Sequence, residues 1–198
     1  NIGPNKDSED RLNDYLIGLR AFQDVADYIT INISSPNTEN LRNFHDETKF
    51  DELMNSIQEE KIKIKSKIPI VVKISPDISE NQISMISKIL LNHKVSAIII
   101  SNTTAKNREK LNNILKHQKG GLSGKPLEEE ANKLISKFYD LLKGKIEIIG
   151  VGGVDSGKSA HRKFLAGASY VQLYTGMVFQ GPNIVRKIKK ELKEILKA

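Results

Sequence analysis

The stretch NISSPN, residues 32–37, places two serines, a proline and two asparagines directly after a run of β-branched residues. A residue that precedes proline is kept out of helical geometry, so Ser35 stays extended before Pro36 and can project over a site. The carboxamides of Asn32 and Asn37 both donate and accept hydrogen bonds, which suits a planar polar ligand. The alternative interpretation is a helix cap or a turn, because Ser, Asn and Thr favour those roles. The stretch alone favours that alternative.

A lysine, Lys73, interrupts the otherwise apolar run IPIVVKIS at residues 68–75. A lysine within a buried strand is costly unless its charge is used. It could instead lie near the strand end and extend its ammonium group to solvent. Because other strand ends in this sequence are also polar, we favour a functional role for Lys73.

Two glycine-rich segments could bring backbone amides close to a ligand. GGLSGKP, residues 120–126, fails the Walker pattern at its first glycine and at its Ser/Thr position. IIGVGGVDSG, residues 148–157, departs from the dinucleotide-binding G-x-G-x-x-G spacing. In barrels, the loops after the last two strands often bind phosphate. Gly153 and the segment 174–176 (YTG) fit that layout.

Five short β-branched runs, each bounded by polar or glycine residues, predict the strands that position these groups. They cover residues 28–34, 68–75, 95–102, 145–153 and 169–176. The segments between them have helical patterns, so a parallel sheet with crossover helices is expected. Two architectures remain open, a doubly wound sheet and a (β/α) barrel, and both bind ligands at the carboxyl ends of the strands. The five polar strand ends therefore predict one shared site.

Helices are predicted where apolar residues recur on one face, and residues 9–26 predict a further helix before the first strand. The irregular segment 103–126 is long enough to be a lid or a binding loop. The residues that share a predicted helix face are Ile83, Ile86, Ile89 and Leu90; Leu134, Ile135, Phe138, Leu141 and Leu142; and Ile184, Val185, Ile188, Leu192, Ile195 and Leu196.

Composition bounds the class of protein. The 198 residues are 38% hydrophobic and 28% charged, which suits one sizeable core, and no signal peptide or membrane-spanning run is visible. Without cysteine the chain has no disulfide, thiolate nucleophile or cysteine metal site. The net charge of +7 comes largely from lysines in predicted helices, such as 185–197. These lysines could simply form solvated helix faces, or they could attract the chain to an anionic membrane or ligand. Nucleic acid is not expected as a partner, since aromatics make up 6% and no recognition motif occurs.

The four histidines have no ligand spacing, so no metal site and no Ser-His-Asp arrangement is predicted. They are His45, His93, His117 and His161.

Taken together and in order, the motifs resemble the dihydroorotate dehydrogenase family, specifically its class 2, quinone-linked branch. They are NIGPNK, NISSPNT, VVKISPD, SNTT, GGLSGKP, IIGVGGVDSG and VQLYT, and they extend over essentially the whole chain. The resemblance implies an α/β fold, a (β/α)8 TIM barrel that binds FMN. It also implies that dihydroorotate loses a hydride to the flavin and a proton to a serine base, in pyrimidine biosynthesis, with a quinone as electron acceptor.

The resemblance assigns roles to individual residues. Ser35 occupies the position of the catalytic base, which needs a dry site and a proton path through Thr38 or water. Ser101 stands where the family usually has threonine, and its hydroxyl preserves the expected contact. Positions matching contacts to orotate are Asn32, Asn37, Asn102 and Thr103. Positions matching contacts to FMN are Asn1, Asn32, Lys73, Ser101, Gly124, Gly153, Tyr174 and Thr175.

The chain begins at NIGPNK, which resembles the end of the third barrel strand. The expectation is a single domain, residues 1–198, forming the C-terminal portion of an incomplete barrel with strands four to eight and without the N-terminal strands. Peripheral association with a bacterial cell membrane or the mitochondrial inner membrane is expected through the missing N-terminal region. Two alternatives remain: a non-catalytic barrel fragment that binds flavin weakly, and a related FMN barrel oxidoreductase acting on another substrate.

Overall fold

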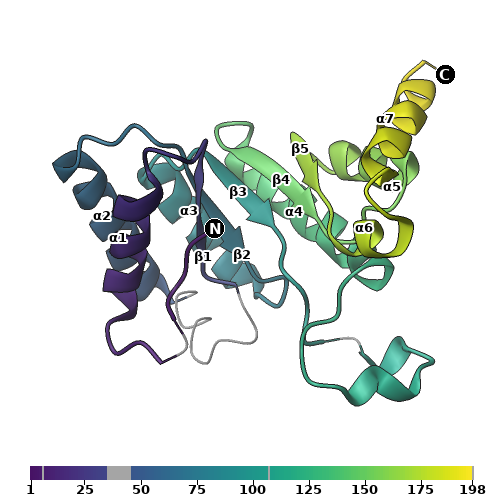
Figure 1. Cartoon of the computed structure of the whole chain (residues 1–198), viewed down its shortest axis with the longest axis horizontal. Helices are drawn as coiled ribbons and strands as arrows, with labels where there is room; N and C mark the ends of the chain where they lie inside the picture. Colours follow the sequence, from purple (N-terminus) through teal and green to yellow (C-terminus); the bar gives the residue numbers. More distant parts are fainter. Residues whose placement is uncertain (6, 35–45, 107, 198) are drawn as a thin grey trace.

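Five parallel strands form one sheet in the computed structural model, which describes residues 1–5, 7–34, 46–106 and 108–197 (Figure 1). The strands are β1 (Ile29–Asn32), β2 (Ile70–Ile74), β3 (Ala97–Ile100), β4 (Glu147–Val151) and β5 (Tyr170–Gln172), and their order in the sheet is their order in the chain. A doubly wound sheet would reverse its order at a switch point. The sequential order is that of a (β/α)8 barrel, so the predicted fold class, an incomplete TIM barrel, is confirmed.

Helices connect the strands, and several begin at a side-chain cap that the sequence supplies. Asp10 accepts a hydrogen bond from the backbone N–H of Asn13, and Ser79 and Gln82 form a reciprocal capping box. The helices are α1 (Arg11–Phe22), α2 (Glu47–Lys63), α3 (Glu80–Asn92), α4 (Glu128–Leu142), α5 (Gly157–Leu165), α6 (Thr175–Gln180) and α7 (Ile184–Ile195). Short 3-10 turns occupy Arg108–Lys110, Ile114–His117 and Lys125–Leu127.

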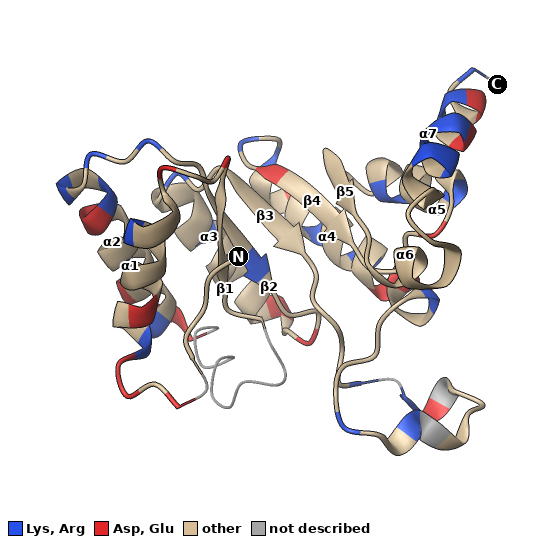
Figure 2. Cartoon of the chain, in the orientation of Figure 1, with Lys and Arg blue, Asp and Glu red and all other residues tan. Residues whose placement is uncertain are grey.

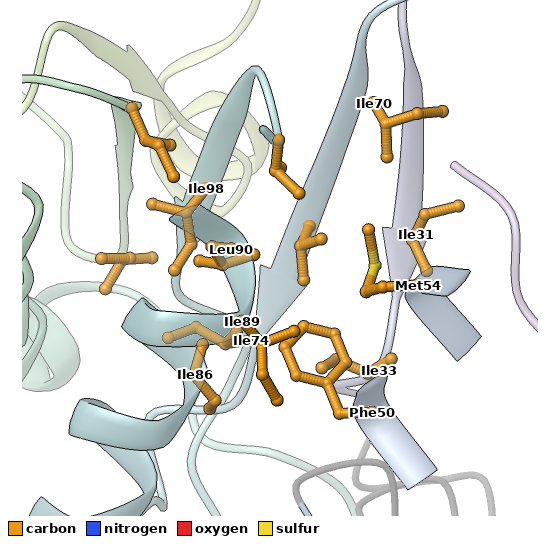
Figure 3. Packing of buried hydrophobic residues seen from close by; sticks show 14 of the residues in the cluster. Ile31, Ile33, Phe50, Met54, Ile70, Ile74, Ile86, Ile89, Leu90 and Ile98 are labelled. Carbon is orange, nitrogen blue, oxygen red and sulfur yellow. The ribbon is translucent and has the colours of Figure 1, made fainter. Parts of the chain in front are cut away.

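Alternation along each strand divides the sheet into two faces, because successive side chains point to opposite sides. On the outer face, Ile31 and Ile98 pack with side chains from α2 and α3, including Phe50 and Leu90 (Figure 3). The inner face has a small separate cluster: Val71, Ala97, Ile99 and Ile149. The main core therefore lies between the sheet and its helices, and the inner face is left to carry the site.

The strand positions are confirmed, but each strand is shorter than predicted. Asn102 and Ser34 lie beyond the ends of β3 and β1, where their side chains bond to one another. The helix predicted at 9–26 is confirmed only as Arg11–Phe22.

Three residues of the predicted helix faces are exposed to solvent. Leu141 and Val185 are each 42% exposed, and Leu196 is 73% exposed. The helix α7 packs mainly against α5, so it covers only the narrow stripe that starts at Ile184 and Ile188. Where the apolar face of a helix is wider than the surface it packs against, the residues at the margins of that face stay exposed to solvent.

The predicted loop at 103–126 extends away from the sheet and carries two of the 3-10 turns (Figure 1). Its base is closed by an antiparallel bridge between Thr104 and Leu122, with N···O distances of 3.1 and 2.7 Å. Within the described ranges, no helix is long and apolar enough to cross a membrane.

Candidate active site

A cavity of about 640 Å³ lies at the carboxyl ends of β2, β3, β4 and β5. Its volume falls within the range of about 300–1,000 Å³ that is common for sites of small ligands and cofactors. Eight of the residues singled out from the sequence line it: Lys73, Ser101, Asn102, Thr103, Gly124, Gly153, Tyr174 and Thr175. The structure thus gathers residues from positions 73 to 175 around one space.

The inner row of the sheet explains why these residues meet. Val71 belongs to the inner-face cluster, so Lys73, two residues later on β2, points to the same face. Ser101 lies one residue beyond the end of β3, two positions after the inner-face residue Ile99, and also lines the cavity. In each case an apolar inner residue is followed by a polar one where the strand ends. The alternation that builds the inner cluster also delivers the polar rim.

Lys73 is the main electrostatic feature of the cavity. It is the basic residue of β2 (IVVKI), and the blue segment on that strand marks its position (Figure 2). Its side chain is half-buried, and burial lowers the pKa of its ammonium group because the charged form loses hydration. No ion pair within the described part of the chain includes Lys73. A partly desolvated cation without a carboxylate partner suits an anionic ligand.

Polar side chains from β1 and β3 form a linked group beside the cavity. The side-chain nitrogen of Asn102 donates to the hydroxyl of Ser34 at 2.9 Å, and that hydroxyl donates to the side-chain oxygen of Asn32 at 2.6 Å. The tyrosine hydroxyl of Tyr15 donates to the backbone oxygen of Asn32 at 2.7 Å. Asn32 does not line the cavity itself, but it pairs in register with Lys73, so both side chains lie on one face.

The carboxylate of Asp77 anchors the segment that follows Asn102 and Thr103. It accepts hydrogen bonds from the Thr104 hydroxyl and, at 2.9 Å, from the backbone N–H of Ala105. Sequence reasoning passed over Asp77 because an aspartate after proline reads as an ordinary turn residue.

The cavity's far rim is held by a contact between two segments distant in sequence. The hydroxyl of Thr175 donates to that of Ser123 at 2.9 Å, which joins the start of α6 to the GGLSGKP segment. Gly153 has φ +75°, and a Cβ there would lie 2.4 Å from the Cβ of Glu128. Only glycine allows this close approach of the loop after β4 to the start of α4.

Several predicted residues are not placed in the cavity. Ser35 and Asn37 lie outside the described residues, as does Thr38. Asn1 is exposed and does not line the cavity, although the next residue, Ile2, pairs in parallel with Ile31 of β1.

Other lining residues, Ser123, Asp155 and Phe179, were missed. Ser123 lies within GGLSGKP, which was recognised for its glycines. Its place in that motif could have marked it as a lining residue.

The sequence of this chain matches a known protein family. The family described as Dihydroorotate dehydrogenase matches residues 1–196. The chain belongs to the dihydroorotate dehydrogenase family. This confirms the resemblance stated from the motifs.

Relatives within the dihydroorotate dehydrogenase family support the quinone-linked branch. The chain is 43% identical over 200 residues to "Dihydroorotate dehydrogenase (quinone)" of Buchnera aphidicola, covering 97% of this chain and 59% of the relative. It is 41% identical over 199 residues to the mitochondrial "Dihydroorotate dehydrogenase (quinone)" of Mus musculus, covering 100% and 50%. The chain therefore spans about half the length of these curated relatives.

Solved structures agree. DHODH of Eimeria tenella in complex with ferulenol superposes with a TM-score of 0.95 at 32% identity, over 98% of this chain and 56% of the other. The ligand-free form of DHODH from the same organism gives a TM-score of 0.94 at 33% identity, over 100% and 59%.

Proposed function

We propose that this chain carries the FMN site and much of the substrate site of a quinone-dependent dihydroorotate dehydrogenase. The reaction is the oxidation of dihydroorotate to orotate in pyrimidine biosynthesis. One observation carries the proposal: a single cavity joins the half-buried Lys73, which has no ion-pair partner among the described residues, to Asn102 and Thr103, in a family whose relatives bear that name.

The cavity suits FMN in its size and in its lining. Three segments, at Gly124, Gly153 and 174–175, bring backbone groups and hydroxyls to one side of it. Lys73 supplies a cation to the same cavity, and a cation there would favour a redox cofactor that becomes anionic when it is reduced. We assign phosphate contacts to the segments at Gly153 and Tyr174, and contacts around the ring system to Lys73 and Ser101.

The substrate side is assigned to the asparagines and to Thr103. Asn102 and Thr103 line the cavity beside Lys73, and their hydrogen-bonding groups suit a ring with amide edges and a carboxylate. FMN, when bound, supplies the hydride acceptor. Ser35 is assigned as the base that takes the proton, and Asn37 as a further substrate contact; both assignments rest on the sequence.

Quinone use and membrane association are part of the same proposal. The relatives include a bacterial and a mitochondrial protein, both named for the quinone. We assign contact with the membrane and the quinone to a region outside residues 1–198, so peripheral association with a bacterial or mitochondrial inner membrane is expected of the natural full-length protein.

The test uses that full-length protein, purified with its bound flavin. It should be yellow, contain about one FMN per chain, and reduce a soluble quinone when dihydroorotate is added. Ser35→Ala should lower turnover by about two orders of magnitude or more, because proton removal loses its base, while the FMN content stays the same. Ser84→Ala, an exposed serine on α3, is the matched control. Normal turnover in Ser35→Ala would refute the assigned base, and a colourless protein would refute the FMN site.

A further inference from the structure

We propose that Ser34 is a positioning residue that fixes the orientation of the Asn32 and Asn102 carboxamides, so that both present N–H donors at the site. This inference rests on the proposed function, because it concerns how the same site selects its ligand. It adds to the assigned contacts a residue that itself touches no ligand.

Ser34 lies between the two asparagines in space. Its side chain is fully buried two residues beyond the end of β1, and Asn102 lies 68 residues away in the chain. The hydroxyl accepts from Asn102 Nδ2 at 2.9 Å and donates to Asn32 Oδ1 at 2.6 Å. A single hydroxyl thus connects the end of β1 to the end of β3.

Two backbone N–H groups set the direction of this chain of hydrogen bonds. The N–H of Thr103 donates to Asn102 Oδ1 at 2.8 Å, and the N–H of Ser34 donates to Asn32 Oδ1 at 3.2 Å. Because a backbone N–H can only donate, each must face the oxygen of its carboxamide. The Ser34 side chain therefore has to accept from one carboxamide and donate to the other, and a hydroxyl does both.

The consequence is that the two carboxamides offer hydrogen-bond donors, and not acceptors, to a ligand. Each carboxamide nitrogen carries two N–H groups, and Ser34 takes one from Asn102. Within the described part of the chain, the Asn32 nitrogen has no hydrogen-bond partner, and its side chain shares a sheet face with Lys73. A ligand edge made of carbonyl or carboxylate oxygens satisfies these donors, and an N–H edge does not. Without the hydroxyl, each carboxamide loses one of the two hydrogen bonds that hold it in this orientation.

The experiment measures orotate binding to the full-length flavoprotein through the change in the flavin absorbance spectrum. Ser34→Ala should weaken orotate binding about tenfold, as expected for the loss of hydrogen bonds worth roughly 1.4 kcal/mol, and leave the FMN content unchanged. Ser34→Thr, which keeps the hydroxyl, should recover most of the affinity. Because Ser34 acts through Asn102, the Ser34→Ala/Asn102→Ala double variant should lose less than the product of the two single losses.

The outcomes separate this inference from the proposed function. A wild-type protein that binds FMN but not orotate contradicts the proposed substrate. A wild-type protein that binds orotate, with Ser34→Ala binding it equally well, overturns only the role of Ser34. Fully multiplicative losses in the double variant would show a general structural role and would also overturn it.

Discussion

The same strands build both faces of the sheet, but the side chains on the two faces differ in kind. The outer face presents Ile31, Val72 and Ile98 to the helices and forms one continuous core. The inner face holds a small apolar cluster and then ends in polar residues such as Lys73 and Ser101. Residues one position apart on a strand therefore have different tasks, since the side-chain period of a strand is two. Stability comes mainly from one face, and the chemistry is assigned to the other.

The largest expected effect compares two neighbours on β3. Ile98 is fully buried in the outer core, and Ile99 is 2% exposed in the inner cluster. Ile98→Ala should lower the free energy of unfolding by about 4 kcal/mol, and Ile99→Ala by about 2 kcal/mol, because the smaller cluster around Ile99 offers fewer packing contacts to lose. Urea unfolding of both variants measures the difference. Equal losses would remove the distinction between the two faces.

The next effect concerns the polar end of the inner face. Lys73→Met should lower turnover about 100-fold, which corresponds to about 2.7 kcal/mol, because the site loses its cation. Its free energy of unfolding should stay the same or rise, because burial lowers the pKa of Lys73 and its charged form is disfavoured in the fold.

Lys67→Met, at an exposed lysine just before β2, serves as the control for Lys73→Met. Steady-state kinetics and urea unfolding test both variants. A Lys73→Met protein with unchanged turnover would mean that the inner face does not need this charge.

The smallest effect tests a charge placed on the outer side. Lys163 of α5 is fully buried, donates to Asn132 Oδ1 at 2.7 Å, and packs over Gly150 of β4. Burial lowers the pKa of Lys163 to about 8 from 10.5, a shift that Glu128 opposes and Arg162 reinforces. Since the unfolded chain keeps this proton up to a higher pH, the contribution of Lys163 to stability should rise as the pH goes from 8 to 10.5.

Lys163→Met should lack this part of the pH dependence. Relative to the variant, the wild type should gain on the order of 2 kcal/mol between pH 8 and pH 10.5. Thermal or urea unfolding of the pair across this range gives the comparison, and the subtraction removes the titration of other lysines. Parallel curves for the two proteins would show that Lys163 titrates normally.

Much of the fold could be predicted from local patterns. The β-branched runs located the five strands that the structure describes, and the alternation of strands and helices predicted the parallel sheet. The same reasoning placed Lys73 on a strand and Gly153 after one, because both statements depend only on neighbours in sequence. Lys163 escaped it, since a lysine in GKSAHRKFL gives no local sign of being fully buried.

The sequence by itself determined the strands, the helices and the polar residues that end each strand, because side-chain period and turn chemistry act over a few residues. Local patterns did not distinguish a doubly wound sheet from a barrel, and the strand order of the tertiary structure confirmed the barrel that the motifs implied, since strand order depends on contacts between distant segments. Only the tertiary structure decided that Ser34 lies between Asn32 and Asn102. A hydrogen bond between residues 68 positions apart produces no periodic pattern in the sequence. The sequence therefore shows that a residue at a strand end is polar, but not which distant residue it bonds to.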